Sequence, residues 1–71
     1  MDRQTLVRMA NDIAAFFAAD PDPEQAAAAV ADHLRRFWEP RMRGEILAHL
    51  QAGGGGLHPI AEQAVRKLAA A

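Results

Sequence analysis

The chain has 71 residues, a formal net charge of −1 and no cysteine, and 17 of its residues are alanine. A domain of this size hides only about 60% of the surface that an unfolded chain exposes, so its core is small and supplies only about 3–5 kcal/mol unless a disulfide, a metal or a partner adds to it. The composition excludes iron–sulfur ligation by thiolates, a thiolate zinc site and a cysteine nucleophile, and the nearly neutral charge argues against general binding to nucleic acids or anionic membranes.

The first expected helix spans residues 3–19. The run from Asp20 to Pro23 ends it, because proline lacks a backbone donor and restricts the residue before it. Five apolar side chains share a stripe about 120° wide at the helical period: Leu6, Met9, Ile13, Phe16 and Phe17.

The second expected helix spans residues 23–38. Asp22 stands at the N-cap, Pro23 at the first helical position and Gln25 three residues after the cap, which is a capping-box pattern. Pro40 ends the helix, because Glu39 is pushed out of the helical region. The inner face is predicted to consist of Ala27, Val30, Leu34 and Phe37.

The third expected helix spans residues 40–52 and the fourth residues 59–69. Gly53 is expected to supply a left-handed C-cap, residues 53–56 a flexible link, and His58 stands where an N-cap would be. The apolar faces are Met42, Ile46, Leu47 and Leu50 in the third helix and Ile60, Ala64, Val65 and Leu68 in the fourth. Since no segment alternates with period two, the sequence predicts an all-α fold. We expect a small bundle of three to four short helices joined by Pro/Gly-rich turns, forming one domain over residues 1–71.

Groups that could carry catalysis are scattered along the chain. His33, His49 and His58 stand on different segments without the i, i+4 pairing of a helical metal site. There is no serine, and the single threonine lies near the amino terminus, which disfavours a hydroxyl nucleophile. The acidic residues at 20–24 lack the spacing of a calcium loop, and the glycine run lacks the Lys-Ser/Thr of a phosphate loop. We therefore expect no catalytic, cofactor-binding or metal-ligating residue, and we expect the chain not to be an enzyme.

Arginines and aromatic residues gather where the second expected helix meets the third. Arg41 and Arg43 fall in the first turn of a helix, where a cation opposes the macrodipole, so local stability alone does not explain them. Tryptophan and arginine are enriched as anchors of protein interfaces. The sequence therefore predicts an exposed corner that binds a partner protein through Arg35, Arg36, Trp38, Arg41 and Arg43, together with Phe17.

A purely local interpretation of the same arginines stays open. Three pairs of opposite charge have i, i+4 spacing: Asp32 with Arg36, Glu39 with Arg43, and Arg41 with Glu45. Such pairs stabilise their own helices by a few tenths of a kcal/mol each, roughly, and need no partner protein.

The corner HLRRFWEPRMR (residues 33–43), preceded by LVRMANDI (6–13) and by Phe16-Phe17, resembles the delta subunit of NAD-dependent formate dehydrogenase. The match is strongest over residues 6–17 and 33–50, and the Gly-rich link before Leu57 and the last helix also fit. The W-[acidic]-P-R-M-R corner is the most specific part of the resemblance.

The resemblance implies an accessory role in a cytoplasmic, oxygen-tolerant complex. In that family a catalytic alpha subunit holds the molybdopterin cofactor and iron–sulfur clusters, and beta and gamma subunits carry FMN, further clusters and the NAD site. The delta subunit carries no redox centre, and supports assembly, stability or cofactor retention of the catalytic subunit. The sequence leaves open which of these applies, and whether the partner uses molybdenum or tungsten.

Two other functions also stay open. One is a molybdenum-cofactor insertion chaperone that touches the pterin phosphates through the corner arginines. The other is a small helical nucleic-acid-binding protein, which the balanced charge and the short basic patch disfavour.

The expected partner is the catalytic alpha subunit, with neither nucleic acid nor membrane involved. The isolated chain is either a monomer or pairs with itself through the face that the partner covers. The amino terminus lacks the pattern of a secretion signal, and no stretch reaches about 18 apolar residues, so we expect a cytoplasmic location.

Overall fold

The structure, a computed structural model, describes residues 2–70. Within this range it contains four helices and no strand: α1 (Arg3–Phe17), α2 (Pro23–Phe37), α3 (Pro40–Gln51) and α4 (Pro59–Ala70). The predicted all-α bundle is confirmed. The helix α1 ends two residues before the expected Ala19, because Asp20 donates its backbone N–H to the carbonyl of Phe17 at 3.0 Å in a turn.

Local side chains begin the first two helices. The Asp2 carboxylate accepts the N–H of Gln4 at 3.3 Å, and the Asp22 carboxylate accepts the N–H of Glu24 at 3.0 Å. The capping box expected from Gln25 is not formed, because Asp20 instead accepts the backbone N–H of Asp22 at 2.9 Å. These bonds satisfy donors that the first turn of a helix leaves unpaired.

Glycines end α3. Gly53 has φ +119° and Gly54 has φ +67°, values that side-chain-bearing residues rarely adopt. The N–H of Gly53 donates to the carbonyl of Leu50 at 3.0 Å, and that of Gly54 to the carbonyl of His49 at 2.9 Å. This pair of bonds is the Schellman motif, so the left-handed cap expected at Gly53 is present and extends to Gly54.

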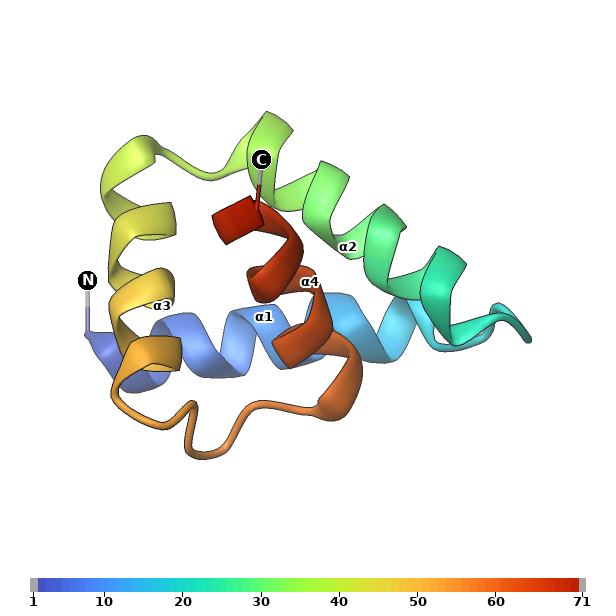
Figure 1. The fold of residues 1–71 in the computed structure, drawn as a ribbon, viewed down its shortest axis with the longest axis horizontal. Coiled ribbons are helices and arrows are strands. Elements are labelled where there is room, and N and C mark those ends of the chain that lie inside the picture. Colours follow the sequence, from blue (N-terminus) through green and yellow to red (C-terminus); the bar gives the residue numbers. More distant parts are fainter. Residues whose placement is uncertain (1, 71) are drawn as a thin grey trace.

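Three helices form a frame, and the fourth crosses it. In Figure 1, α1, α2 and α3 outline three sides and α4 lies across the space between them. The helix α4 contacts all three others, α2 most extensively, whereas α2 and α3 touch little beyond the corner that joins them. The core is therefore organised around α4.

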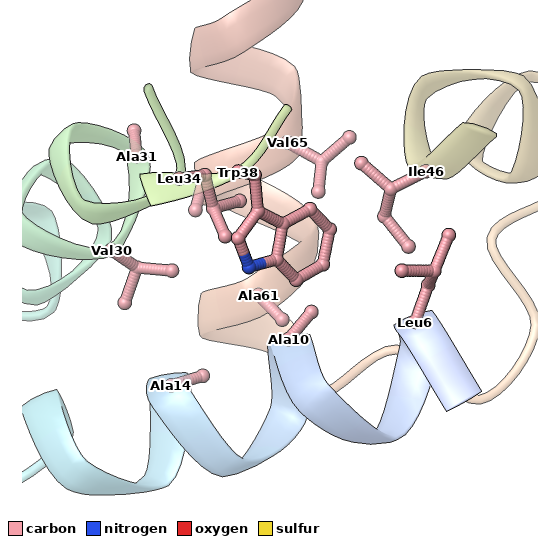
Figure 2. Packing of buried hydrophobic residues seen from close by; sticks show 11 residues of the cluster. Leu6, Ala10, Ala14, Val30, Ala31, Leu34, Trp38, Ile46, Ala61 and Val65 are labelled. Atoms are coloured by element: carbon pink, nitrogen blue, oxygen red, sulfur yellow. The ribbon is translucent and has the colours of Figure 1, made fainter. Parts of the chain in front are cut away.

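Small side chains make up much of that core. Alanines permit close approach of helices where larger side chains would hold them apart, and they alternate here with a few larger apolar residues, as Figure 2 shows. The buried cluster consists of Leu6, Ala10, Ala14, Val30, Ala31, Leu34, Trp38, Ile46, Ala61, Ala64 and Val65.

Two phenylalanines expected to face inward do not. Phe16 is 77% exposed and Phe37 is 70% exposed. Both lie at the carboxyl ends of their helices, Phe37 being the last residue of α2 and Phe16 the last but one of α1. The helical period assigns a side chain to a face, but it does not say whether a neighbouring helix reaches that far.

Candidate docking surface

Trp38 is buried, contrary to the prediction that it is exposed. Its side chain lies among Leu34, Ile46 and Val65 in the centre of the frame, and only 5% of the residue is exposed (Figure 2). The helix α2 has ended before it: Trp38 has φ −89° and ψ 137°, an extended conformation that turns the indole inward. An indole so placed anchors the corner from inside, so the part of the docking prediction that needed an exposed Trp38 is wrong.

Arg43 also serves the fold. One of its guanidinium nitrogens, Nη1, donates to the carbonyl of Arg35 at 2.9 Å and to that of Trp38 at 2.7 Å. The last carbonyls of a helix have no partner within the helix. Arg43 therefore caps the end of α2 from the next helix, and the expected pair with Glu39 is not formed.

Arg35 and Arg36 both lie on the surface but differ in their contacts. Arg35 donates Nη2 to the backbone carbonyl of Lys67 at 3.2 Å, which ties α2 to α4. Arg36 places Nε 3.1 Å from Asp32, in the expected i, i+4 pair, and its side chain remains 70% exposed. Arg36 is thus the more available of the two cations.

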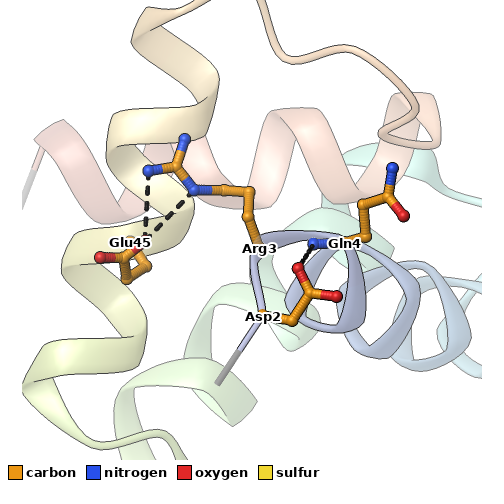
Figure 3. A network of polar contacts seen from close by, with 4 residues as sticks. All are labelled: Asp2, Arg3, Gln4 and Glu45. Atoms are coloured by element: carbon orange, nitrogen blue, oxygen red, sulfur yellow. Dashed lines mark hydrogen bonds and ion pairs between the residues drawn. The ribbon is translucent and has the colours of Figure 1, made fainter.

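Arg41 is exposed and makes no hydrogen bond or ion pair with any described residue. It borders a shallow hollow of about 280 Å³ together with Leu6, Glu39, Met42 and Glu45. The expected pair of Arg41 with Glu45 is absent, because Glu45 instead accepts two bonds from Arg3 of α1, at 3.2 and 3.1 Å (Figure 3). Arg41 therefore keeps its full hydrogen-bonding capacity.

Phe17 belongs to a set of aromatic side chains that spans α1 and α2. Its ring contacts that of Phe16 edge-on, with centroids 5.2 Å apart, and lies 6.3 Å from the imidazole of His33. His33 in turn lies 4.8 Å from the ring of Phe37. We call these four residues, Phe16, Phe17, His33 and Phe37, the aromatic ridge.

The structure thus separates the predicted docking residues. Trp38 and Arg43 hold the corner together, whereas Arg36, Arg41 and Phe17 present atoms to solvent. The two most exposed phenylalanines were missed as candidates, since the period placed both of them inside. Their position at helix ends beside a Pro-containing break was the available signal. The docking role of the arginines and of Phe17 stays a prediction.

The Gly-rich segment is held by side chains from two helices. The Asn11 amide donates Nδ2 to the carbonyl of Gly56 and accepts the N–H of His58 through Oδ1, both at 2.8 Å. His49 lies 2.7 Å from the carbonyl of Gly55 through Nε2. His58 accepts the N–H of Ile60 at Nδ1, 3.1 Å away, so its expected place at the N-cap is confirmed. Side chains of α1 and α3 therefore hold the link that was predicted to be flexible.

Among residues 2–70, no three side chains of histidine, cysteine, aspartate or glutamate come together as a metal site would require. In the same range no helix combines the length and the apolar character needed to cross a membrane.

Comparison with known families adds to this geometry. A family model described as "NADH-dependant formate dehydrogenase delta subunit FdsD" matches residues 5–65 of the 71 in the chain. The chain belongs to this family. The matched range contains all four residues of the aromatic ridge and the whole corner between α2 and α3. It also includes residues 6–17 and 33–50, where the resemblance seen in the sequence is strongest, and the resemblance is confirmed. None of the curated proteins and none of the solved structures matches the chain.

Proposed function

We propose that this chain is a non-catalytic accessory subunit of a cytoplasmic formate dehydrogenase complex, and that it acts by docking onto the catalytic alpha subunit. The observation that carries the proposal is the match of the delta-subunit family over residues 5–65. The docked chain supports assembly, stability or cofactor retention of its partner.

The surface of the chain agrees with a docking function. A monomeric protein buries little apolar surface with a phenylalanine that remains 77% or 70% exposed, and both such residues lie in one cluster of rings. Contiguous exposed apolar patches are typical of sites where proteins bind other proteins, membranes or ligands.

In this proposal the redox groups belong to the partner subunits. Molybdopterin, iron–sulfur clusters, FMN and NAD are held there, and this chain holds none of them. The absence of cysteine from the sequence supports the division of labour for the iron–sulfur clusters, which need thiolate ligands.

The test is to produce the other subunits of the complex with and without this chain. We expect the chain to co-purify with the catalytic subunit in a fixed ratio. We also expect the complex that lacks it to lose formate-dependent NAD reduction faster on warming, or to contain less pterin. Formate oxidation by the purified chain alone, or a catalytic subunit that never retains it, would contradict the proposal. Native mass spectrometry showing the pterin cofactor on the isolated chain would favour the insertion chaperone instead.

A further inference from the structure

The aromatic ridge lies on the side of α1 and α2 that faces away from α4. On α2, Arg35 bonds to α4 and so marks the side of the helix that faces α4. His33 and Phe37 are each two residues from Arg35, which places them about 160° away from it around the helix axis. On α1, Asn11 binds the start of α4, and Phe16 is five residues further, about 140° around. In Figure 1, α4 lies between α1 and α2, and α3 lies beside the amino-terminal end of α1; Phe16 and Phe37 remain 77% and 70% exposed.

The ridge is a continuous row of aromatic rings across both helices. Phe17 and His33 bridge α1 and α2, and Phe16 and Phe37 extend the row at either end. Aromatic side chains with few rotatable bonds lose little conformational entropy on binding, which is why they are frequent among residues that dominate interface affinity.

Charges border the ridge with opposite sign on its two sides. Arg36, adjacent to Phe37 in the sequence, places Nε 3.1 Å from a carboxylate oxygen of Asp32, and its side chain remains 70% exposed, so its guanidinium is accessible to a partner. Such a guanidinium fork matches a carboxylate with two parallel bonds. On the α1 side, the exposed Asp12 lies one turn before Phe16 and makes no ion pair with any described residue.

We propose that the aromatic ridge is the centre of the surface that docks onto another subunit of the formate dehydrogenase complex, where it meets an apolar patch with a carboxylate opposite Arg36. This inference rests on the function proposed above and names the surface and the chemistry of its partner. It differs from the corner predicted from sequence, because Trp38 and Arg43 are committed to the fold.

The family match favours another subunit over a second copy of the chain as the occupant of the ridge, because the matching family model describes one subunit of a formate dehydrogenase. A phenylalanine offers about 200 Å² of contact area. Two mostly exposed phenylalanines therefore fall well short of the roughly 800 Å² that each partner buries in a stable interface. The contact must therefore extend beyond the two phenylalanines onto the exposed surface around them, which includes Arg36 and Asp12.

The experiment measures binding of the folded chain to the other subunits, purified as a complex that lacks it. We expect Phe16→Ser with Phe37→Ser to weaken binding by at least about 30-fold, as loss of central interface residues does. Phe16→Leu with Phe37→Leu, which keeps apolar bulk, should stay within about 5-fold of wild type. Arg36→Glu should weaken binding about 10-fold, and Arg8→Glu, an equal charge change at an exposed residue of α1, should not.

Each outcome of the binding experiment supports or contradicts the proposal. If wild type binds and the folded double serine variant binds equally well, the ridge is not the docking surface, although the proposed function stands. If wild type does not bind at all, both proposals fail. A wild-type dimer in light scattering that the serine variant converts to a monomer overturns the assignment of the partner. Should the serine variant not fold, amide exchange of wild type decides: slower exchange at residues 13–18 and 33–38 in the complex supports the ridge, and protection confined to other segments overturns it.

Discussion

The indole of Trp38 fills the space that α2, α3 and α4 enclose, in contact with the cluster that includes Leu34, Ile46 and Val65. Trp38→Ala is expected to cost about 3–5 kcal/mol, because it removes the largest core side chain and leaves a cavity. A domain this small has little more stability than that, so the variant should be largely unfolded at room temperature. Trp38→Phe should retain most of the helical circular dichroism and unfold at a lower urea concentration than wild type.

The burial of Trp38 also has a spectroscopic consequence that does not depend on a variant. Trp38 is the only tryptophan, so fluorescence reports on this residue alone. Its indole N–H has no hydrogen-bond partner among residues 2–70. It is also not one of the fully buried, unpaired polar groups, so it reaches solvent within the 5% of the residue that is exposed. Emission should be at shorter wavelength than that of free tryptophan and shift to longer wavelength in urea. Emission that urea leaves unchanged would contradict the core position.

Arg41 and Arg43 both lie in the first turn of α3, so the same substitution at each position can be compared directly. Arg43→Gln should lower the free energy of unfolding by about 1–2 kcal/mol, since two carbonyls at the end of α2 lose a charged donor. Arg41→Gln should change it by less than about 0.5 kcal/mol, because Arg41 makes no hydrogen bond or ion pair with any described residue and opposes the helix dipole. Urea unfolding followed by circular dichroism measures both. Equal effects of the two changes would mean that Arg43 does not cap α2.

Residue-level prediction from the sequence succeeded where the cause was local and failed where it was not. The i, i+4 pair of Arg36 with Asp32 formed as expected. Glu45 had a partner on the same helix within reach and bonded instead to Arg3, which lies 42 residues away. Phe37, which the helical period placed inside, is exposed, and Trp38, which was predicted to be exposed, is buried, because the backbone leaves the helix between them.

At the level of the elements, the glycines after α3 provide a test of backbone geometry. Gly54 has φ +67°, and a Cβ there would lie 3.3 Å from Leu50 Cδ1, whereas Gly55 has no positive φ and open space around its Cβ. Gly54→Ala should lower the free energy of unfolding by about 1–2 kcal/mol, the cost of a left-handed residue with a side chain. Gly55→Ala should be neutral, or should stabilise by about 0.4–1 kcal/mol because it restricts the unfolded chain.

The two alanine variants share composition and differ in position by one residue, so their difference in urea midpoint isolates the backbone conformation. A loss of stability in Gly55→Ala equal to that in Gly54→Ala would argue against the Schellman geometry. Amide exchange at residues 55–58 gives a second measure, since Asn11 and His49 hold this segment in place.

The helices themselves were predictable because residues at or next to each helix end determine where the helix begins or stops. Asp22-Pro23, Pro40 and Gly53 each act within one or two positions of a helix end, and the observed ends follow them. The arrangement of the helices was not predictable in the same way. The helix α4 can cross the frame because small alanine side chains from helices far apart in the sequence meet where the helices cross. The helical period shows which residues share a face, but it does not show which faces pack together.

For the molecule as a whole, the ion pairs contribute little and the apolar contacts dominate. The four described pairs all have side chains at least 35% exposed, and surface pairs of this kind are worth about 0–1 kcal/mol each. Salt screens such pairs without weakening apolar burial. The free energy of unfolding should therefore change by less than about 1 kcal/mol between about 0.05 M and about 1 M NaCl.

Salt dependence of binding also distinguishes the two surfaces through which the chain could dock, the aromatic ridge and the corner between α2 and α3. If the aromatic ridge carries the affinity, the dissociation constant for the other subunits should rise by less than about 10-fold between about 0.05 M and about 0.5 M NaCl, since one guanidinium contributes at the edge. Docking through the corner arginines would place several cations against the partner and should weaken binding by more than about 100-fold over the same range. Biolayer interferometry on the purified subunits measures the slope, and the neutral variant Arg36→Gln should remove most of the residual salt dependence. A steep slope that persists in Arg36→Gln and becomes shallower in Arg41→Gln would move the interface from the ridge to the corner between α2 and α3.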